Sequence, residues 1–402
     1  MEVVHERCCG LDVHKKIVVA CLLTGRQKEV RTFSTMTREL LHLADWLAAA
    51  GCTQVAMEST GSYWKPVYNI LEVSCTVLVV NAQHMKAVPG RKTDVKDAEW
   101  IADLLRHGLL RPSFIPDRAS RDLRELTRYR TSVIRERTAE VNRIQKVLEG
   151  ANIKLASVAS NVVGVSGQAM LTAMIAGVDD PSVLADLARG RLREKRELLE
   201  AALEGRMTQH QRFLLGVQLH HLSDLDLTIT QVSEEIDVRL HPFAEVAARL
   251  QTIPGVGERT AQIVLAEVGA DMSRFPNAGH LASWAGLCPG HHESAGKRMS
   301  GRTRKGSPWL RGALVEAAQS AGRSRTHLGQ RYHRIAARRG KKRAAVATAH
   351  MILIAAYHIL GGDRCFEDPG VDYIDRRRSQ QTTRRLVRKL EGLGYRVSIE
   401  AA

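Results

Sequence analysis

The chain has 402 residues, of which 44% are hydrophobic, so it can bury sizeable cores and is not an intrinsically disordered protein. Its 59 Lys and Arg residues outnumber its 43 Asp and Glu residues, which gives a formal net charge of +16. This excess of positive charge favours a polyanionic partner, and nucleic acid is the first candidate.

The seven cysteines are odd in number and form no CxxC pair, so they predict neither a disulfide framework nor a zinc ribbon. A reducing cytoplasm fits this pattern best. The N-terminus shows no basic stretch followed by an apolar run, and we find no long uncharged apolar segment. We therefore expect a soluble cytoplasmic protein that has no membrane partner.

The first 115 residues alternate short β-rich runs with helical patterns. Strands are predicted for CCGLDVHKKIVVACLL, read as two strands joined by a tight polar turn, and for KEVRTFST, TQVAMEST and CTVLVVNA. Helices are predicted for TRELLHLADWLAAAG, SYWKPVYNILEV and DVKDAEWIADLLRHG. Three strands followed by strand–helix alternation predict an α/β domain, with a mixed sheet and helices packed on it.

From about Asp117 the sequence becomes long, charged and helical. Apolar side chains recur there at helical spacing in two stretches: Leu123, Leu126, Val133, Val141, Ile144 and Leu148, then Leu222, Leu225, Ile229, Val232 and Ile236. These heptad seams predict an antiparallel helix pair, an intermolecular coiled coil, or an ordinary bundle within one chain. The residues between them, about 151–200, are expected to be looser.

A third region begins near Leu250 with LQTIPGVGERTAQIVLAEVG. Two helical segments flank residues 254–257, as in a helix-hairpin-helix whose glycines, here Gly255 and Gly257, let backbone N–H groups approach a phosphate. A plain turn between two helices is the alternative. From Asp363 the chain holds DRRRSQQTTRRLVRKL, which is either a nucleic-acid arm or a solvated tail.

Four carboxylates of the first domain form a candidate site for Mg²⁺ or Mn²⁺. Asp12 lies within the first predicted strand and Glu58 ends another, while Asp94 and Asp97 share one face at the start of a predicted helix. Mg²⁺ prefers a few carboxylate oxygens together with water and phosphate oxygens. Each residue has a structural alternative, such as Asp94 as a helix N-cap or Glu58 at the start of a turn.

The stretch CPGHHESAGKRMSGRTRKGSPWLR, residues 288–311, places Ser294 in a basic, glycine-rich setting. A predicted turn at 288–290 and the flexible Gly296 disfavour a regular helix through Ser294. A serine hydroxyl needs a base, a metal or an electropositive setting to attack phosphorus. Nearby cations could position a phosphate and stabilise its developing charge: Lys297, Arg298, Arg302, Arg304 and Lys305. The alternative is a solvated basic loop.

The chain resembles the DEDD transposases of the bacterial insertion-sequence 110/1111 family in five motifs that occur in the same order: GLDVHKK, AMESTGSYWKPV, GRKTDVKDAEWIADLL, LQTIPGVGERTA and LASWAGLCPGHHESAGKRMSGRTRKGSPWLR. The resemblance implies a RuvC-like ribonuclease H fold whose metal ligands are the four carboxylates. It also implies a nucleophilic serine at Ser294. This chain has Ala295 where the family often has glycine, and Ser300 and Ser307 are alternative nucleophiles.

The function that the resemblance implies is cutting and rejoining of DNA. Ser294 would attack the DNA backbone and form a phosphoserine linkage, which a strand hydroxyl later reverses. The implied partners are double-stranded donor and target DNA, a structured guide (bridge) RNA, and further copies of the chain, as a dimer and a tetramer on DNA. Two alternatives stay open: a metal-dependent, structure-specific nuclease similar to Holliday-junction resolvases, and a non-enzymatic architectural DNA binder.

We accordingly expect four regions along the chain. Residues 1–115 form the RuvC-like DEDD metal-binding domain, and residues 116–245 form a helical coiled-coil region. Residues 246–362 form a mostly helical C-terminal transposase domain with the helix-hairpin-helix and the serine nucleophile. Residues 363–402 form a basic tail.

Overall fold

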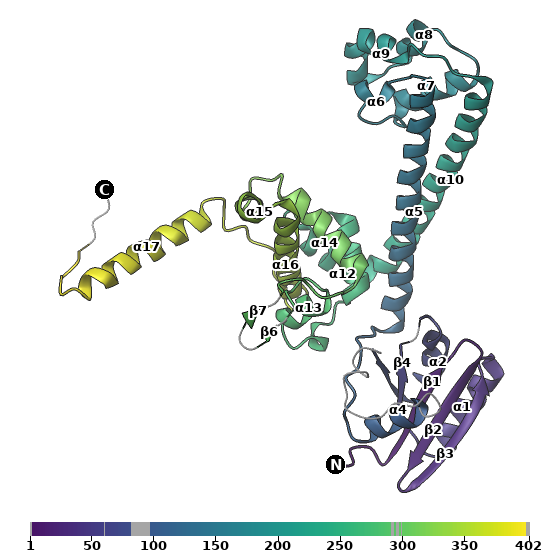
Figure 1. Cartoon of the computed structure of the whole chain (residues 1–402), viewed down its shortest axis with the longest axis vertical. Helices are drawn as coiled ribbons and strands as arrows, with labels where there is room; N and C mark the ends of the chain where they lie inside the picture. The colour runs from purple at the N-terminus through teal and green to yellow at the C-terminus, as the bar shows by residue number, and fades with distance from the viewer. Residues whose placement is uncertain are drawn as a thin grey trace. The chain divides into compact units, whose positions relative to one another are not determined.

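The structure is a computed structural model that describes residues 2–59, 61–81, 97–290, 293–294, 297–298 and 300–398. It divides into two compact units, Met1–Ile115 and Pro116–Ala402 (Figure 1). The first unit combines a sheet with helices. In its described part, the second unit is helical apart from a two-stranded hairpin.

The first unit is built on a mixed five-stranded sheet with the strand order β3-β2-β1-β4-β5. Its strands are β1 (Arg7–Val13), β2 (Ile17–Thr24), β3 (Gln27–Ser34), β4 (Gln54–Glu58) and β5 (Thr76–Val80). The first three strands pair antiparallel, whereas β4 runs parallel to β1 and β5 runs parallel to β4. The predicted mixed sheet is therefore confirmed.

Helices cover both faces of this sheet. Alternate residues of a strand point to opposite faces, so each strand contributes side chains to both apolar cores. The helices are α1 (Thr37–Ala49), α2 (Trp64–Leu71) and α4 (Asp97–Arg106). Leu11 and Met57 belong to the apolar core beneath α1 and α2. Cys8 and Ala56, on the opposite face, belong to the core beneath α4.

Helix α4 lies unusually close to β1 and runs antiparallel to it. At the helix end, the backbone N–H of Val4 donates to the carbonyl oxygen of Arg106 at 2.9 Å. Near the helix start, a Cβ on Gly10 would lie 2.3 Å from the Ala98 carbonyl oxygen and 2.3 Å from the Ala102 backbone nitrogen. Only glycine allows this approach, so Gly10 fixes the position of the helix on the strand.

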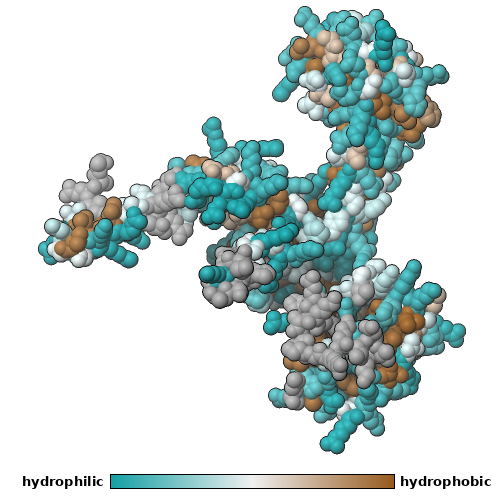
Figure 2. Space-filling view, viewed as in Figure 1, coloured by the Kyte–Doolittle hydropathy of each residue, from teal (hydrophilic) through white to brown (hydrophobic). Residues whose placement is uncertain are grey.

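The second unit begins with two long helices, α5 (Arg118–Gly150) and α10 (Gln209–Leu240), which pack against each other as an antiparallel pair (Figure 1). Of the three arrangements that the heptad seams allow, the structure has this pair within one chain. Most of the predicted seam residues are buried: Leu123, Val133, Ile144 and Leu148, with Leu222, Leu225, Ile229 and Ile236. On the face of the pair shown in Figure 2, the side chains are mostly hydrophilic or neutral.

Polar side chains interrupt the apolar seam. Thr127, Arg130 and Glu140 are buried within it. Arg130 donates to the Ser233 hydroxyl of α10 at 3.3 Å, and Arg137 Nη2 donates to an Asp226 carboxylate oxygen at 3.0 Å. Such polar contacts in an apolar seam are satisfied in only one alignment of the helices, so they set the register of the pair.

Residues 151–208 fold into a helical cap between the two long helices. The cap comprises α6 (Leu155–Val158), α7 (Val165–Ile175), α8 (Pro181–Asp186), the 3₁₀ helix η2 (Gly190–Lys195) and α9 (Arg196–Leu203). Its apolar side chains form one core with Ile144 and Leu148 of α5 and Leu215 of α10. The expectation of a looser stretch at 151–200 is wrong, because helices this short give no sustained periodic pattern.

The rest of the second unit is a helical bundle. Its helices are α11 (Ala244–Gln251), α12 (Glu258–Val268), α13 (Ala278–Trp284), α14 (Pro308–Ala321), α15 (His327–Arg339) and α16 (Lys341–Leu360). Among the described residues, α16 alone is long and apolar enough to cross a membrane. Its packing against α11, α13, α14 and α15 accounts for that apolar composition.

The segment that follows α16 is attached to the bundle by specific contacts. Arg249 donates to the Asp363 carboxylate at 2.6 Å. The carboxylate of Asp368 accepts from the backbone N–H of His327 at 3.0 Å, at the start of α15. The last helix, α17 (Tyr373–Glu391), follows this segment. The basic tail therefore begins with residues that dock on the bundle.

The two glycines of the turn between α11 and α12 have different structural roles. Gly255 has a φ of +87°, and a Cβ there would lie 2.2 Å from the Ala317 carbonyl oxygen of α14. Gly257 is exposed at the N-cap of α12, and a Cβ there would meet nothing within 4 Å. Gly255 thus lets the turn pack on α14, whereas Gly257 leaves backbone open to solvent.

We predict opposite results for Gly255→Ala and Gly257→Ala. The first combines a strained backbone with a backbone clash and should destabilise the second unit by at least about 1–3 kcal/mol. The second should cost less than about 1 kcal/mol, the difference between glycine and alanine at an N-cap. Urea unfolding followed by circular dichroism measures both. Equal unfolding midpoints for the two variants would contradict the assigned role of Gly255.

Candidate active site and nucleic-acid interface

The carboxylates of Asp12 and Glu58 lie beside each other on adjacent parallel strands. Leu11 of β1 pairs with Met57 of β4, so the next residue of each strand, Asp12 and Glu58, continues the same register. Their sheet partners Val19 and Val80 pack with the core beneath α4. Because paired residues of neighbouring strands point to the same face, both carboxylates lie on the α4 face, where each residue is half-buried.

Asp97 reaches the same edge of the sheet from the helix above it. It is the first residue of α4, which runs antiparallel to β1, so it lies toward the ends of β1 and β4 where Asp12 and Glu58 are found. Asp94 lies outside the described residues. Within the described part of the chain, no three His, Cys, Asp or Glu side chains are close enough to form a ready metal cluster. The backbone therefore brings three carboxylates to one edge without closing a ligand set.

His14 is a further residue at this edge of the sheet and was not among the predicted site residues. Its Nε2 lies 3.0 Å from Oδ2 of Asp12, whose side chain is 21% exposed. The signal was present in GLDVHKK, because residues i and i+2 of an extended chain point to the same side. His14 thus orients the Asp12 carboxylate.

Ser294 lies in a short β-hairpin. Strand β6 (Glu293–Ser294) pairs antiparallel with β7 (Lys297–Arg298), and Ser294 is the direct partner of Lys297. At the base of this excursion, Pro289 pairs with Thr303, and the Gly290 N–H donates to the Arg302 carbonyl oxygen at 2.9 Å. We call residues 289–303 the basic arm; Ala295 lies outside the described residues.

The predicted cations of this region are exposed where their side chains are described. Lys297 belongs to the hairpin, Arg302 lies at its base, and Arg304 and Lys305 follow the arm. Below them the chain segments on either side of the arm approach closely, since a Cβ on Gly286 would lie 2.6 Å from the Gly306 nitrogen. These cations therefore lie on one loop of the chain, whose flanking segments approach each other.

The two alternative nucleophiles differ in what their hydroxyl groups contact. Ser300 Oγ accepts a hydrogen bond from the Arg302 N–H at 3.1 Å in an exposed position. Ser307 is the N-cap of α14, and its Oγ accepts from the Leu310 N–H at 3.3 Å. The same hydroxyl lies 3.1 Å from a carboxylate oxygen of Glu267. The Ser307 hydroxyl is therefore used to cap helix α14, whereas Ser294 lies in a hairpin.

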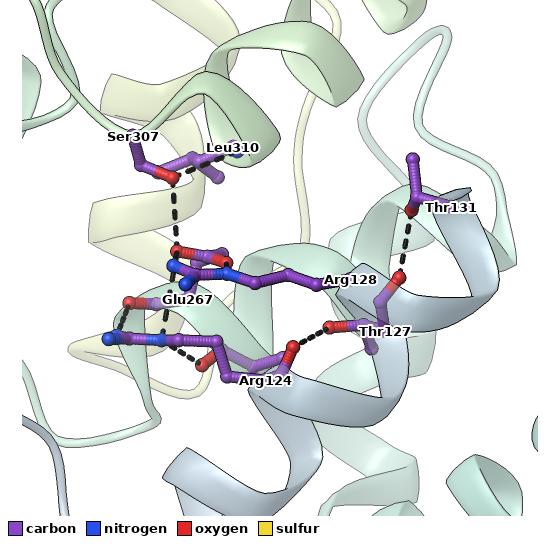
Figure 3. Close-up of polar contacts among 8 residues, drawn as sticks. Arg124, Thr127, Arg128, Thr131, Glu267, Ser307 and Leu310 are labelled. Atoms are coloured by element: carbon purple, nitrogen blue, oxygen red, sulfur yellow. Dashed lines mark hydrogen bonds and ion pairs between the residues drawn. The ribbon is translucent and has the colours of Figure 1, made fainter. Parts of the chain in front are cut away.

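Glu267 is the centre of a buried polar cluster that joins three helices (Figure 3). Its side chain is completely buried in α12, and Arg128 of α5 donates to its two carboxylate oxygens at 2.6 and 2.9 Å. Arg124 donates to its backbone carbonyl oxygen at 2.5 Å, and burial lowers the pKa of Arg124 to about 10. With the Ser307 contact, this cluster holds the start of α14, which follows the basic arm, against α5.

Two family models of known proteins match this chain, one over the region with the carboxylates and the other over the region with the basic arm. A family model described as a transposase matches residues 9–153, and the model of the transposase IS116/IS110/IS902 family matches residues 247–334. The insertion element IS116 protein of Streptomyces clavuligerus is 30% identical over 61% of this chain and 68% of its own length. The chain belongs to the IS110 family of transposases.

Other relatives of this IS110-family chain carry names that describe DNA rearrangement. The transposase of insertion sequence element IS1111A from Coxiella burnetii is 25% identical over 85% of this chain and 83% of its own length. A pilin gene-inverting protein of Moraxella bovis is 29% identical over 47% of this chain and 60% of its own length. IS110-family proteins are enzymes that cleave and rejoin DNA, so the prediction of a transposase is confirmed.

We predict that Glu267→Gln loosens the basic arm of this transposase. Removing the carboxylate charge leaves Arg128 without its counter-ion and should cost about 3 kcal/mol. Urea unfolding measures the loss, and the rate of trypsin cleavage within the arm reports the local loosening. Glu316→Gln, which removes an exposed charge from α14, is the matched control and should change neither. An unchanged midpoint in Glu267→Gln would contradict the proposed importance of the cluster.

Proposed function

We propose that this chain is an RNA-guided DNA recombinase of an insertion sequence, in which Ser294 forms a covalent phosphoserine linkage with DNA. Asp12, Glu58, Asp94 and Asp97 would hold Mg²⁺ or Mn²⁺ in a RuvC-like ribonuclease H domain. The observation that carries the proposal is the arrival of three of these carboxylates at one edge and one face of the sheet, in a chain of the IS110 family. The mixed sheet with helices on both faces supports the fold assignment.

The carboxylate edge suits a hard divalent cation. Asp12, Glu58 and Asp97 offer oxygen ligands from three different elements, and Asp94 would add a fourth. Half-burial of the described carboxylates leaves them reachable by a phosphate from solvent. When bound, the cation would polarise the scissile phosphate and offset its developing charge.

The proposed serine chemistry conserves the energy of the phosphodiester bond, because one P–O ester bond is exchanged for another. In the first step Ser294 Oγ bonds to phosphorus, the bond from phosphorus to one strand oxygen breaks, and that strand end leaves as a hydroxyl. In the second step the hydroxyl of the strand to be joined attacks the phosphoserine and releases Ser294. Lys297, the hairpin partner of Ser294, and Arg302 supply positive charge beside the reacting phosphate.

Nucleic-acid recognition is proposed for the second unit. The basic arm residues and the exposed backbone at Gly257 would contact DNA phosphates, whereas Gly255 serves packing on α14. Guidance by a structured RNA and assembly into dimers and tetramers on DNA rest on the resemblance to the family. We assign residues 116–245 to a coiled-coil region, 246–362 to the transposase domain and 363–402 to a basic tail.

The metal assignment predicts that Asp12→Asn weakens Mn²⁺ binding by at least about tenfold, since even outer ligand partners contribute that much. Strand cleavage should be lost with it. Calorimetric titration of the full chain with Mn²⁺ measures the affinity independently of activity. Asp45→Asn, at an exposed position of α1, is the matched control and should bind Mn²⁺ normally. Full recombination by Asp94→Asn and Asp97→Asn would remove that pair from the site.

The serine assignment predicts that Ser294→Ala binds nucleic acid but neither cuts nor rejoins it, because the attacking oxygen is absent. The wild-type reaction on a nicked or mismatched DNA duplex should leave a protease-resistant adduct, which mass spectrometry locates on the peptide with Ser294. Ser300→Ala is the matched control from the same arm and should retain the adduct.

Three outcomes of that experiment separate the candidates. An adduct on Ser300 or Ser307 would move the nucleophile within the arm region. Normal cleavage by Ser294→Ala with no adduct at all would replace the recombinase by a metal-dependent nuclease that hydrolyses DNA. Binding without any cleavage by the wild type, with both Mn²⁺ and guide RNA supplied, would favour an architectural DNA binder.

A further inference from the structure

A large cleft opens between the basic arm and helices α14, α15 and α16. Its volume is about 970 Å³. Pro289 and residues 300–303, which form the base of the basic arm, make one wall. Residues of α15 and α16 make the opposite wall. The cleft therefore adjoins the basic arm, which carries Ser294, and no pattern in the sequence predicted it.

Six cations line this cleft, and no Asp or Glu lines it with them. They are Arg302, Arg311, Arg331, Arg339, Lys342 and Arg343. In the part of the chain that the structure describes, none of the six forms an ion pair. The arginines of the long helical pair differ, since Arg137 pairs with Asp226 and Arg239 pairs with Glu235. Unpaired like charges repel each other, so their concentration in one cleft favours an anionic ligand.

Cations at the junction of α15 and α16 contribute to this positive charge, although they destabilise the start of α16. Lys341, Lys342 and Arg343 fill the first turn of α16, where the helix dipole disfavours cations. Gly340, between the helices, has a φ of +82° and provides no side chain to cap α16. Cations at an uncapped helix start are locally unfavourable, and such conflicts in natural proteins mark functional sites.

The floor of the cleft is apolar. It is lined by Leu287, Ile335, Val346, Ala347 and Met351. His350 also lines it, and burial, with Arg331 nearby, lowers the pKa of this histidine, so the imidazole is neutral at neutral pH. In a duplex the base faces are stacked inside and cannot reach such a floor, whereas the bases of a single strand can.

We propose that this cleft binds a single strand of nucleic acid, with its phosphates on the six cations and its bases against the apolar floor. The inference rests on the proposed function and names the strand opened during recombination, or the guide RNA, as a ligand held beside the hairpin of Ser294. Both strands present the same phosphodiester backbone and unpaired bases. The corresponding sequence is RYHRIAARRGKKR, residues 331–343. Its cations form a binding site only because the fold places them opposite the basic arm.

The test is fluorescence anisotropy of the full chain with labelled oligothymidine, oligouridine and a DNA duplex of the same length, over a range of salt. The cleft variant combines Arg339→Ala, Lys342→Ala and Arg343→Ala. The matched control combines Arg191→Ala, Lys195→Ala and Arg206→Ala, which removes the same charge from exposed positions of the helical cap. Circular dichroism checks that both variants keep the helical content of the wild type.

For single strands, the slope of log affinity against log salt should fall by about two units in the cleft variant, because each lost phosphate contact contributes about 0.7. The control variant should keep the wild-type slope. The single strand that loses more affinity, deoxyribose or ribose, identifies whether opened DNA or guide RNA is the ligand. Equal slopes for the two variants, or a loss confined to the duplex, would overturn the proposal.

The serine adduct reports on the proposed function separately. An adduct on Ser294 together with unchanged slopes in the cleft variant would retain the recombinase and reject the cleft. A slope change confined to the cleft variant, without any adduct in the wild type, would retain the cleft and reject the serine chemistry. The two proposals therefore fail in distinguishable ways.

Discussion

The buried carboxylate of Glu267 constrains the whole second unit. A carboxylate removed from water is stable only if cations and hydrogen-bond donors replace its hydration, so its partners are obligatory. Those partners come from α5, through Arg128, and from the start of α14, through Ser307. A second chain of polar contacts reinforces the same junction, since Gln262 of α12 accepts from Arg130 at 2.6 Å and donates to Asp237 of α10 at 2.7 Å. The two long helices, helix α12 and the start of α14 thus share one anchoring point.

Positive charge is distributed unevenly over the second unit, and this distribution follows its architecture. Along the long helical pair, Arg137, Arg143 and Arg239 are matched by carboxylates of the same or the facing helix, so their charge serves register and solubility. The six cations of the cleft beside the basic arm form no such ion pairs among the described residues. The net charge of +16 favours a polyanionic partner, but it locates a binding surface only when paired and unpaired cations are separated, which requires the fold.

Local sequence patterns predicted the helices and strands well, but they did not predict contacts between residues that are distant in the sequence. The five strands, the helices of the first unit and the two long helices followed from periodicity, because each pattern lies within one element. The cluster at Glu267 did not, since Arg128 is 139 residues away and LAEVG looks like ordinary helix. For the same reason Gly255 and Gly257 looked equivalent in sequence, although only the first packs on α14. Asp12 and Glu58 stood out as acids in apolar strands, but their shared face required the parallel register of β1 and β4.

The proposed chemistry makes a demand that hydrolysis does not. A nuclease completes its task when the strand ends leave, but a recombinase that stores the bond energy as phosphoserine must keep each freed end until it is rejoined. Retention requires binding energy that acts on a single strand close to the nucleophile, since a freed end has lost its covalent tether. Unpaired cations over an apolar floor, beside the base of the arm that carries Ser294, provide that kind of binding. The contact of Glu267 with Ser307 then suits the proposed chemistry, because it ties the start of α14, which lines the cleft and follows the arm, to helix α5.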